Sequence, residues 1–283
     1  MSAPLWRALF FQPASAQYSF SVCARPRDIL GALEFWGNGD RMAFFERALA
    51  AALFCLPAAA LASDRPYLAA TNAVADEDDD NVIALESWIE SARRFREFRF
   101  EPEYNFNPRN AVRFELGIAR DQRTDPAVNS RGAEIEFKHL FTDLARSGFG
   151  AGVIVGVDWD GRRAGLEGAE QGAHAWTLGA AGLVTLRPTA DTLIHFNLGG
   201  LKATNESAHA RWAVAAEHEI VRRTTLFVEA GATAHEQRLV HAGLRHWVKR
   251  ERFAIDLTAG RRHGDPASSS FVTLGIALQD IYW

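Results

Sequence analysis

The chain has 283 residues, a formal net charge of −4, 48% hydrophobic residues and 23% charged residues. Its basic residues are scattered rather than gathered in one patch, which argues against a nucleic-acid-binding protein. Apolar runs of ~18 or more residues do not recur, so a bundle of membrane-spanning helices is excluded. A β-barrel of an outer membrane remains compatible with this composition, because half of each of its strands is polar.

Residues 42–62 have the composition of an export signal. Arg47 precedes an apolar run over residues 48–59, and Ala60-Leu61-Ala62 ends it in the small-x-small form that signal peptidase cleaves. A buried helix or a membrane anchor fits less well, because the run is short and contains a proline. We therefore expect cleavage after Ala62, and we interpret residues 1–41 as a misassigned upstream extension that is disordered; an extended leader is the alternative.

The stretch that follows the signal is predicted to be unstructured. Both cysteines, Cys23 and Cys55, precede residue 63, so the mature chain folds without disulfides. Residues 63–81 contain the acidic run 76–80, and such runs are usually solvated. We predict an acidic periplasmic tether here. A calcium site is the weaker alternative, because the carboxylate spacing matches no calcium-binding loop.

From residue 82 onward, apolar and polar residues alternate with a period of two, which predicts β-strands. We expect twelve of them, over residues 82–89, 96–106, 111–121, 131–141, 148–159, 173–187, 191–202, 210–220, 225–235, 239–249, 252–263 and 270–281. Most are about twice as long as the ~5–6 residues usual in globular proteins. They match the ~9–11 residues that a tilted strand needs to cross a membrane.

The connections between these strands alternate between short and long. Short ones cover residues 107–110, 188–190, 221–224 and 250–251; long ones cover 122–130, 160–172, 203–209 and 264–269. Outer-membrane barrels show this asymmetry, with tight periplasmic turns and larger external loops. Bacterial barrels have an even number of strands, so residues 82–89 are predicted to form the first strand. An amphipathic helix over residues 85–95 is the alternative. The predicted fold is an all-β, antiparallel, up-and-down membrane barrel of residues 82–283.

In this barrel the apolar face of each strand should contact lipid and the charged face should line the lumen. The expected lipid-facing residues include Val112, Phe114, Leu116, Ile118, Ala133, Ile135, Phe137, Trp212, Val214, Ala216, Val272, Leu274, Ile276 and Leu278. The expected lumen-lining residues are Arg99, Glu101, Glu103, Arg113, Glu115, Glu134, Glu136, Lys138, Asp158, Arg187, His195, Asn197, Arg211, Glu217, Glu219, Glu229, Arg245 and Asp256. Opposite charges on neighbouring strands can pair there.

The chain end carries two further predictions. Outer-membrane barrels commonly finish on an aromatic residue that the assembly machinery recognises, and Trp283 occupies that place. However, strict alternation from Leu278 would put Trp283 on the inner face. We therefore predict a β-bulge near Gln279 and Asp280 that shifts the register by one residue.

The sequence offers little for chemistry. The nine histidines have no cysteine companions and no metal-ligand spacing, so no metal or other cofactor is expected. His195 and Asn197 invite comparison with the Ser-His-Asn arrangement of twelve-stranded outer-membrane phospholipases. Asn197 occupies the place of the required serine, and Ser207 falls in a predicted loop. We therefore expect no catalytic residues and no enzyme.

Two short segments carry a family resemblance. Phe100-Glu101-Pro102-Glu103-Tyr104-Asn105-Phe106 followed by Val112-Arg113-Phe114-Glu115-Leu116, and His195-Phe196-Asn197-Leu198-Gly199, resemble patterns in Gram-negative outer-membrane transporters. These include the family named for the meta pathway of phenol degradation. The resemblance implies a twelve-strand barrel and the uptake of small compounds, including aromatic or hydrophobic ones.

The combined prediction is a porin-like channel in the outer membrane of a Gram-negative bacterium, passing small solutes through a charged lumen. Its expected partners are outer-membrane lipid, lipopolysaccharide, the barrel-assembly machinery through the last strand, and the solute, with no nucleic acid. Three alternatives remain: a structural or surface-interaction barrel with a closed lumen, an outer-membrane lipid hydrolase, and a soluble periplasmic β-protein.

Overall fold

The computed structural model describes residues 67–74, 81–123, 127–164, 174–204, 206–233, 238–250, 252–263 and 269–281, with the backbone alone at 162–164, 174–175 and 280–281. The predicted upstream extension, the export signal with its cleavage site at Ala62, and Trp283 lie outside these residues. Among the described residues, no helix is long and apolar enough to cross a membrane.

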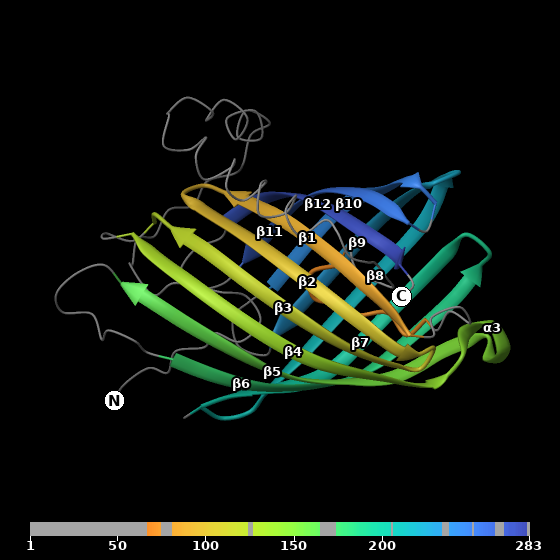
Figure 1. Cartoon of the computed structure of the whole chain (residues 1–283), viewed down its shortest axis with the longest axis horizontal. Coiled ribbons are helices and arrows are strands. Elements are labelled where there is room, and N and C mark those ends of the chain that lie inside the picture. The colour runs from red at the N-terminus through yellow and green to blue at the C-terminus, as the bar shows by residue number, and fades with distance from the viewer. Residues whose placement is uncertain are drawn as a thin grey trace.

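Twelve antiparallel strands close into a single barrel, as predicted (Figure 1). They are β1 (Val82–Ala92), β2 (Phe95–Asn107), β3 (Asn110–Asp121), β4 (Val128–Thr142), β5 (Phe149–Ala164), β6 (His174–Thr189), β7 (Thr192–Ala203), β8 (His209–Val221), β9 (Thr224–Thr233), β10 (Arg238–Lys249), β11 (Phe253–His263) and β12 (Ser269–Ile281). Each strand pairs with its neighbours in sequence, and β1 pairs with β12 to close the ring. Closure leaves no unpaired sheet edge.

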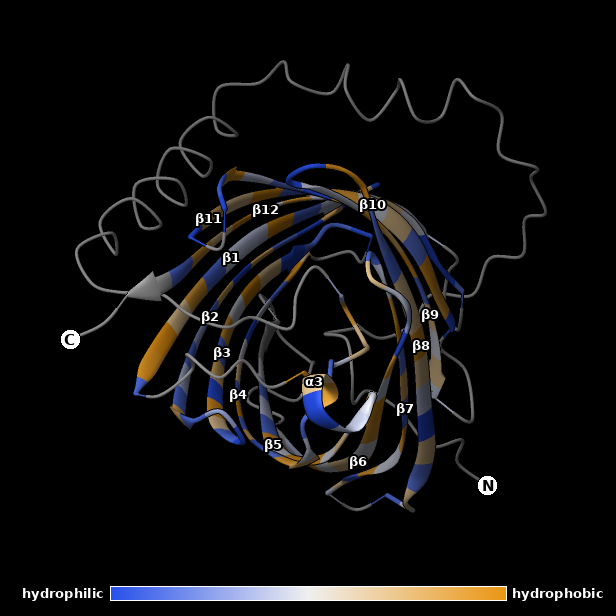
Figure 2. Ribbon diagram, turned by 90° about the vertical axis from the view of Figure 1, so that its right-hand side faces the viewer, coloured by the Kyte–Doolittle hydropathy of each residue, from blue (hydrophilic) through white to orange (hydrophobic). Residues whose placement is uncertain are grey.

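Polar and apolar residues alternate along the strands (Figure 2), and the two faces of the barrel differ accordingly. Along β3, for example, Phe114, Leu116 and Ile118 are exposed on the outside, whereas Glu115 between them is buried on the inside. Large exposed apolar side chains recur on the other strands, and Leu198 on β7 is 70% exposed. An apolar outer surface with a polar interior is the reverse of a soluble protein and suits a barrel surrounded by lipid.

The first strand and the predicted bulge are both present. Residues 85–92 of the range for which a helix was the alternative lie in β1, and β1 pairs with β2 along its whole length. On the other side of β1, Ile83 pairs with Ile281, but Leu85 pairs with Leu278. Two residues of β12, Gln279 and Asp280, therefore face the single residue between Ile83 and Leu85. This extra residue is the register shift that the chain end requires.

The two-residue turn Arg93-Arg94 between β1 and β2 lies at the end of the barrel that carries the longer connections. The connections after β2, β4, β6, β8 and β10 lie at the opposite end, together with the start of β1 and the end of β12. One of them contains α3 (Leu144–Ser147), a single helical turn between β4 and β5. Asp143 caps it by accepting a hydrogen bond from the Ala145 backbone N–H at 2.8 Å. Gly148 ends it with a φ of 76°, a conformation that glycine adopts without strain.

Candidate functional site: the barrel lumen

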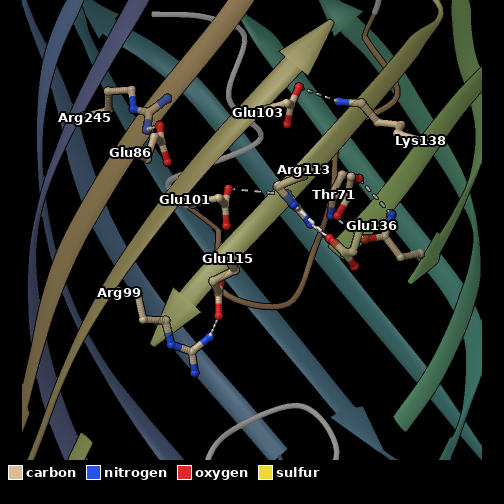
Figure 3. Close-up of polar contacts among 11 residues, drawn as sticks. Thr71, Glu86, Arg99, Glu101, Glu103, Arg113, Glu115, Glu136, Lys138 and Arg245 are labelled. Carbon is tan, nitrogen blue, oxygen red and sulfur yellow. Dashed lines mark hydrogen bonds and ion pairs between the residues drawn. The ribbon is translucent and has the colours of Figure 1, made fainter. Parts of the chain in front are cut away.

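Buried ion pairs cover one side of the lumen, which we call the ionic wall (Figure 3). It is formed by inward side chains of β1–β4 and β10–β11: Glu86, Glu90, Glu97, Arg99, Glu101, Glu103, Arg113, Glu115, Glu136, Lys138, Arg245, Asp256 and Arg262. Each of these groups comes from an inward position, so the strand alternation alone determines that they share one surface.

The strand register brings opposite charges together in this wall. Arg113 on β3 lies directly opposite Glu136 on β4, and its Nε donates to Glu136 Oε2 at 2.8 Å. Arg99 on β2 reaches diagonally to Glu115 on β3, with 2.6 Å between Nη1 and Oε1. Because both members of each pair are largely buried, solvent screens these contacts far less than surface pairs.

Two carboxylates bind Arg245 on β10. Its Nε and Nη2 each donate to one oxygen of Asp256 on β11 at 2.8 Å, which is the planar bidentate geometry of guanidinium and carboxylate. Its Nη2 also donates to Glu86 on β1 at 2.8 Å. The arginine therefore joins β10 and β11 to β1, across the closure of the barrel.

Carboxylates outnumber cations in the described part of the lumen. The buried carboxylates on the strands are Glu86, Glu90, Glu97, Glu101, Glu103, Glu115, Asp121, Glu136, Asp160, Glu229 and Asp256, whereas the buried Lys and Arg side chains are Arg99, Lys138, Arg211 and Arg245. Glu115, Glu134 and Asp158 even lie directly opposite one another across β3, β4 and β5. Like charges in such a row repel, so the interior favours cations.

A second element lies against the opposite side of the lumen: residues 67–74, which we call the strap. This segment falls within residues 63–81, for which we predicted a periplasmic tether, but its backbone is hydrogen bonded to side chains inside the barrel. We call the inner surface of β6–β9 that it contacts, together with His241 on β10, the strap wall. Figure 3 shows Thr71 of the strap in the same interior as the ionic wall.

Glu229 on β9 holds the start of the strap. Its carboxylate accepts hydrogen bonds from three successive backbone N–H groups, those of Leu68 at 2.8 Å, Ala69 at 2.7 Å and Ala70. It also contacts Nε2 of His241, which lies directly opposite on β10. Four donors therefore surround one fully buried carboxylate, which offsets the cost of removing its charge from water.

Two neutral side chains hold the rest of the strap. The Asn197 amide on β7 accepts from Thr71 N–H at 2.6 Å and donates to Thr71 C=O at 2.9 Å, as a neighbouring strand would do. Thr185 Oγ1 on β6 accepts from Ala73 N–H at 2.8 Å, and lies 2.9 Å from His195 Nδ1. His195 and Asn197 thus serve the binding of the strap.

The strap also packs through its side chains. Tyr67 lies against Phe227 and His195, with ring centroids 5.9 and 5.1 Å away, and its hydroxyl donates to Glu217 Oε2 at 2.7 Å. Burial, and then the nearby Glu217 carboxylate, raise the pKa of Tyr67 well above its ordinary value, so the hydroxyl stays protonated and able to donate.

Ala73, at the other end of the strap, is fully buried among Leu140, Ile154, Ala181 and Leu183. Its backbone approaches β5 so closely that a Cβ on Gly150 would lie 1.7 Å from the Ala73 carbonyl oxygen. Gly150 therefore leaves the room that Ala73 occupies in this position.

The structure places most of the predicted lumen residues inside the barrel. Buried are Arg99, Glu101, Glu103, Glu115, Glu136, Lys138, His195, Asn197, Arg211, Glu229, Arg245 and Asp256, and partly buried are Arg113, Glu134, Asp158, Glu217 and Glu219. Arg187 is exposed, because it lies at the end of β6 beyond the last regular pair with β7.

Sequence reasoning missed several lumen groups and the strap itself. Glu86 and Glu90 are an even number of residues apart on β1 and so lie on the same face. The alternation of that strand could have identified both as lumen residues. Thr185 and His241 carry no such signal, because their roles depend on partners on other elements. In the described residues, no three His, Cys, Asp or Glu side chains are arranged to hold a metal ion.

Solved structures share this barrel. The KdgM porin superposes with a TM-score of 0.54 at 9% identity, covering 70% of this chain and 99% of the porin. A structure of the KdgM porin in complex with disordered oligogalacturonate gives a TM-score of 0.52 at 9% identity, with the same coverage. At such identity the likeness shows the fold alone, which is that of an outer-membrane β-barrel of the porin type.

The family follows from the sequence. The model of the family described as "Uncharacterised conserved protein UCP029691" matches residues 57–279, so the chain belongs to that family. The match includes the strap as well as nearly all of the barrel. No curated protein matches the sequence. The resemblance to the family of the meta pathway of phenol degradation stays a prediction.

Proposed function

We propose that this protein is an outer-membrane channel that passes small solutes through its charged lumen. One observation carries the proposal: a closed twelve-strand barrel has an apolar outer surface and charged side chains on its inner face. Lipid can cover the outside of such a barrel, whereas an interior lined with Glu and Arg favours water and ions. The fold shared with the KdgM porin is consistent with this role.

The same lumen suggests which solutes would pass. Buried carboxylates exceed buried Lys and Arg among the described strands, so cations should be favoured over anions. The strap takes up part of the interior, which favours small solutes over large ones. Small aromatic or hydrophobic compounds, which the family resemblance implies, remain candidate cargo.

Planar-bilayer recording tests this proposal. The purified protein, shown to be folded by its heat-modifiable gel mobility, should give steady steps of conductance. Under a potassium chloride gradient the reversal potential should have the sign of a cation-selective pore. A folded protein that gives no conductance would exclude the channel, and an anion-selective reversal potential would exclude the argument from lumen charge.

A barrel with a closed lumen is the second candidate, and the strap favours it. Five backbone N–H groups of the strap are bound by barrel side chains, so the segment is not loosely held. Together with the ionic wall it could fill the interior, leaving the external loops to bind a partner. Absent conductance in a folded barrel is the outcome that this candidate expects.

An outer-membrane lipid hydrolase is the third candidate. Ser207 Oγ lies 3.3 Å from His209 Nε2 at the connection between β7 and β8, and Thr185 Oγ1 lies beside His195. The Thr185 hydroxyl is buried under the strap and bound to Ala73, so it is poorly placed for a lipid. Fatty-acid release from phospholipid, lost in Ser207→Ala, would support this candidate.

The proposed location has its own tests. The protein should fractionate with the outer membrane, with lipid and lipopolysaccharide around its apolar surface. Leu198→Arg, in the middle of the exposed apolar surface of β7, should destabilise the barrel in lipid by about 2–4 kcal/mol. Recovery in the soluble fraction would contradict the membrane location. Recognition of the last strand by the assembly machinery is also a proposal, and slower assembly on deleting Trp283 would support it.

A further inference from the structure

The strap is a peptide segment that barrel side chains, and not a sheet edge, hold inside the lumen. An extended segment normally adds to a sheet edge and uses the backbone of the neighbouring strand. A closed barrel has no edge, because every strand is paired on both sides. Polar backbone groups of the strap can therefore be satisfied only by side chains of the wall or by water.

The strap wall supplies such side chains in a regular arrangement. Thr185, His195, Ala215, Glu229 and His241 lie directly opposite one another across β6, β7, β8, β9 and β10, and so form one row around the inside of the barrel. Asn197 lies one inward position along β7 from His195. The acceptors that bind peptide N–H groups, Thr185, Asn197 and Glu229, thus lie in this row or next to it, on β6, β7 and β9.

The contacts along this row recognise the backbone of the peptide and limit the size of its side chains. Glu229, Asn197 and Thr185 bind N–H groups of the strap, and Asn197 also binds a carbonyl. Small residues are needed where the strap approaches the wall: a Cβ on Gly231 would lie 3.2 Å from Ala69 Cβ, and Gly150 leaves room for Ala73. A ring is accepted at one place, between Phe227 and His195.

We propose that the strap wall is a binding site for a short peptide, an aromatic residue followed one position later by small residues, which the strap fills in cis. Because most of the polar contacts go to backbone groups, a peptide on a separate molecule can make them equally well. The strap then acts as a tethered ligand that competes with such a peptide. This inference adds a ligand class to the proposed channel and does not depend on whether the lumen conducts.

A cut strap allows the site to be tested in the full chain. A recognition sequence for a site-specific protease replaces residues 76–79, and the folded protein is cleaved in detergent. A fluorescent peptide with the sequence of residues 64–75 is then added in excess, and its exchange into the barrel is followed by fluorescence anisotropy. Saturable binding to the cleaved protein, with little binding to the uncut protein, is the expected result.

Matched peptides and variants identify the contacts. Methylating the Ala70 amide nitrogen removes a donor to Glu229, and should weaken binding at least about tenfold, as should Glu229→Gln. Methylating the Val74 amide nitrogen is the control, because that N–H donates to Asn72 within the strap itself. Glu219→Gln is the control on the barrel, because Glu219 binds the Arg223 backbone in a turn.

A second variant covers the case in which the protease fails to cut. Ala70→Pro in the uncut chain removes the same N–H without changing any strand, and should admit the peptide where the wild type excludes it. Equal affinity for the two methylated peptides, no exchange into either form, or unchanged binding to Glu229→Gln would overturn the proposal. Conductance is not a readout here, so a silent barrel that binds the peptide would refute the channel alone.

Discussion

The two sides of the lumen satisfy their buried polar groups in different ways. On the ionic wall, strand side chains pair with one another, as Arg245 does with Asp256 and Glu86. On the strap wall, Glu229, Asn197 and Thr185 bind the backbone of a segment that belongs to no strand. The ionic wall can therefore form whenever the barrel closes, whereas the strap wall is complete only when residues 67–74 are inside.

This difference predicts that the two walls fail differently. Removing a group from the ionic wall leaves an uncompensated charge inside the barrel, and should affect the stability of the whole fold. Removing a group from the strap wall should first release the strap and leave the barrel intact. Four substitutions, in order of decreasing effect, test the comparison.

The largest effect is expected for Arg245→Met. The substitution leaves the buried carboxylates of Asp256 and Glu86 without their cation, which should cost about 3–5 kcal/mol of barrel stability. Urea unfolding in lipid vesicles, followed by tryptophan fluorescence, measures it. Arg222→Met, in the exposed turn between β8 and β9, is the control and should leave the midpoint unchanged. Equal midpoints for the two variants would mean that the ionic wall contributes nothing to stability.

Glu229→Gln should act on the strap. Gln keeps the shape of the side chain but loses the charge that three N–H groups and His241 share. Loss of about one charge-assisted hydrogen bond should accelerate amide exchange at residues 68–70 by about 10–100-fold. Hydrogen-exchange mass spectrometry measures this change. Exchange should stay slow in the strands, and acceleration along β9 and β10 as well would show that strap and barrel are one cooperative unit.

Gly150→Ala tests the close approach of the strap to β5. The added methyl group meets the Ala73 carbonyl, so the end of the strap must shift, at a cost of about 1 kcal/mol. We expect up to about tenfold faster exchange at the Ala73 amide. Gly182→Ala on β6 is the control, because its Cβ would meet nothing nearer than 3.8 Å. Indistinguishable exchange in the two variants would contradict the described position of Ala73.

The smallest effect is expected for Arg123→Met, two residues after the end of β3. Arg123 forms an ion pair with Asp121 at 2.8 Å, but its side chain is 27% exposed, and water screens the pair. We expect a loss of at most about 1 kcal/mol in the same urea measurement. A loss as large as that of Arg245→Met would show that burial does not decide the strength of these pairs.

Much of the fold could be predicted from the sequence because a strand in a barrel is a local pattern. The alternation of Phe114, Glu115 and Leu116 fixes both faces of β3 without knowledge of any neighbour. The even number of strands in bacterial barrels predicted β1. The face on which strict alternation would place Trp283 predicted the bulge at Gln279 and Asp280. Most charged residues of the ionic wall were predicted from the same alternation, whereas Glu86, Glu90, Glu97 and Arg262 were not.

Only the tertiary structure decided the place of the strap. Apolar and polar residues do not alternate in residues 67–74, and an acidic run follows, so the local sequence predicts part of a tether. Their hydrogen-bond partners include Thr185, 112 residues after Ala73, and Glu229, 161 residues after Leu68. Most of their polar contacts use backbone groups, which every residue carries. Because backbone groups are the same in nearly every residue, the sequence does not reveal which of them are bound. The strap and its wall come together only when the barrel closes.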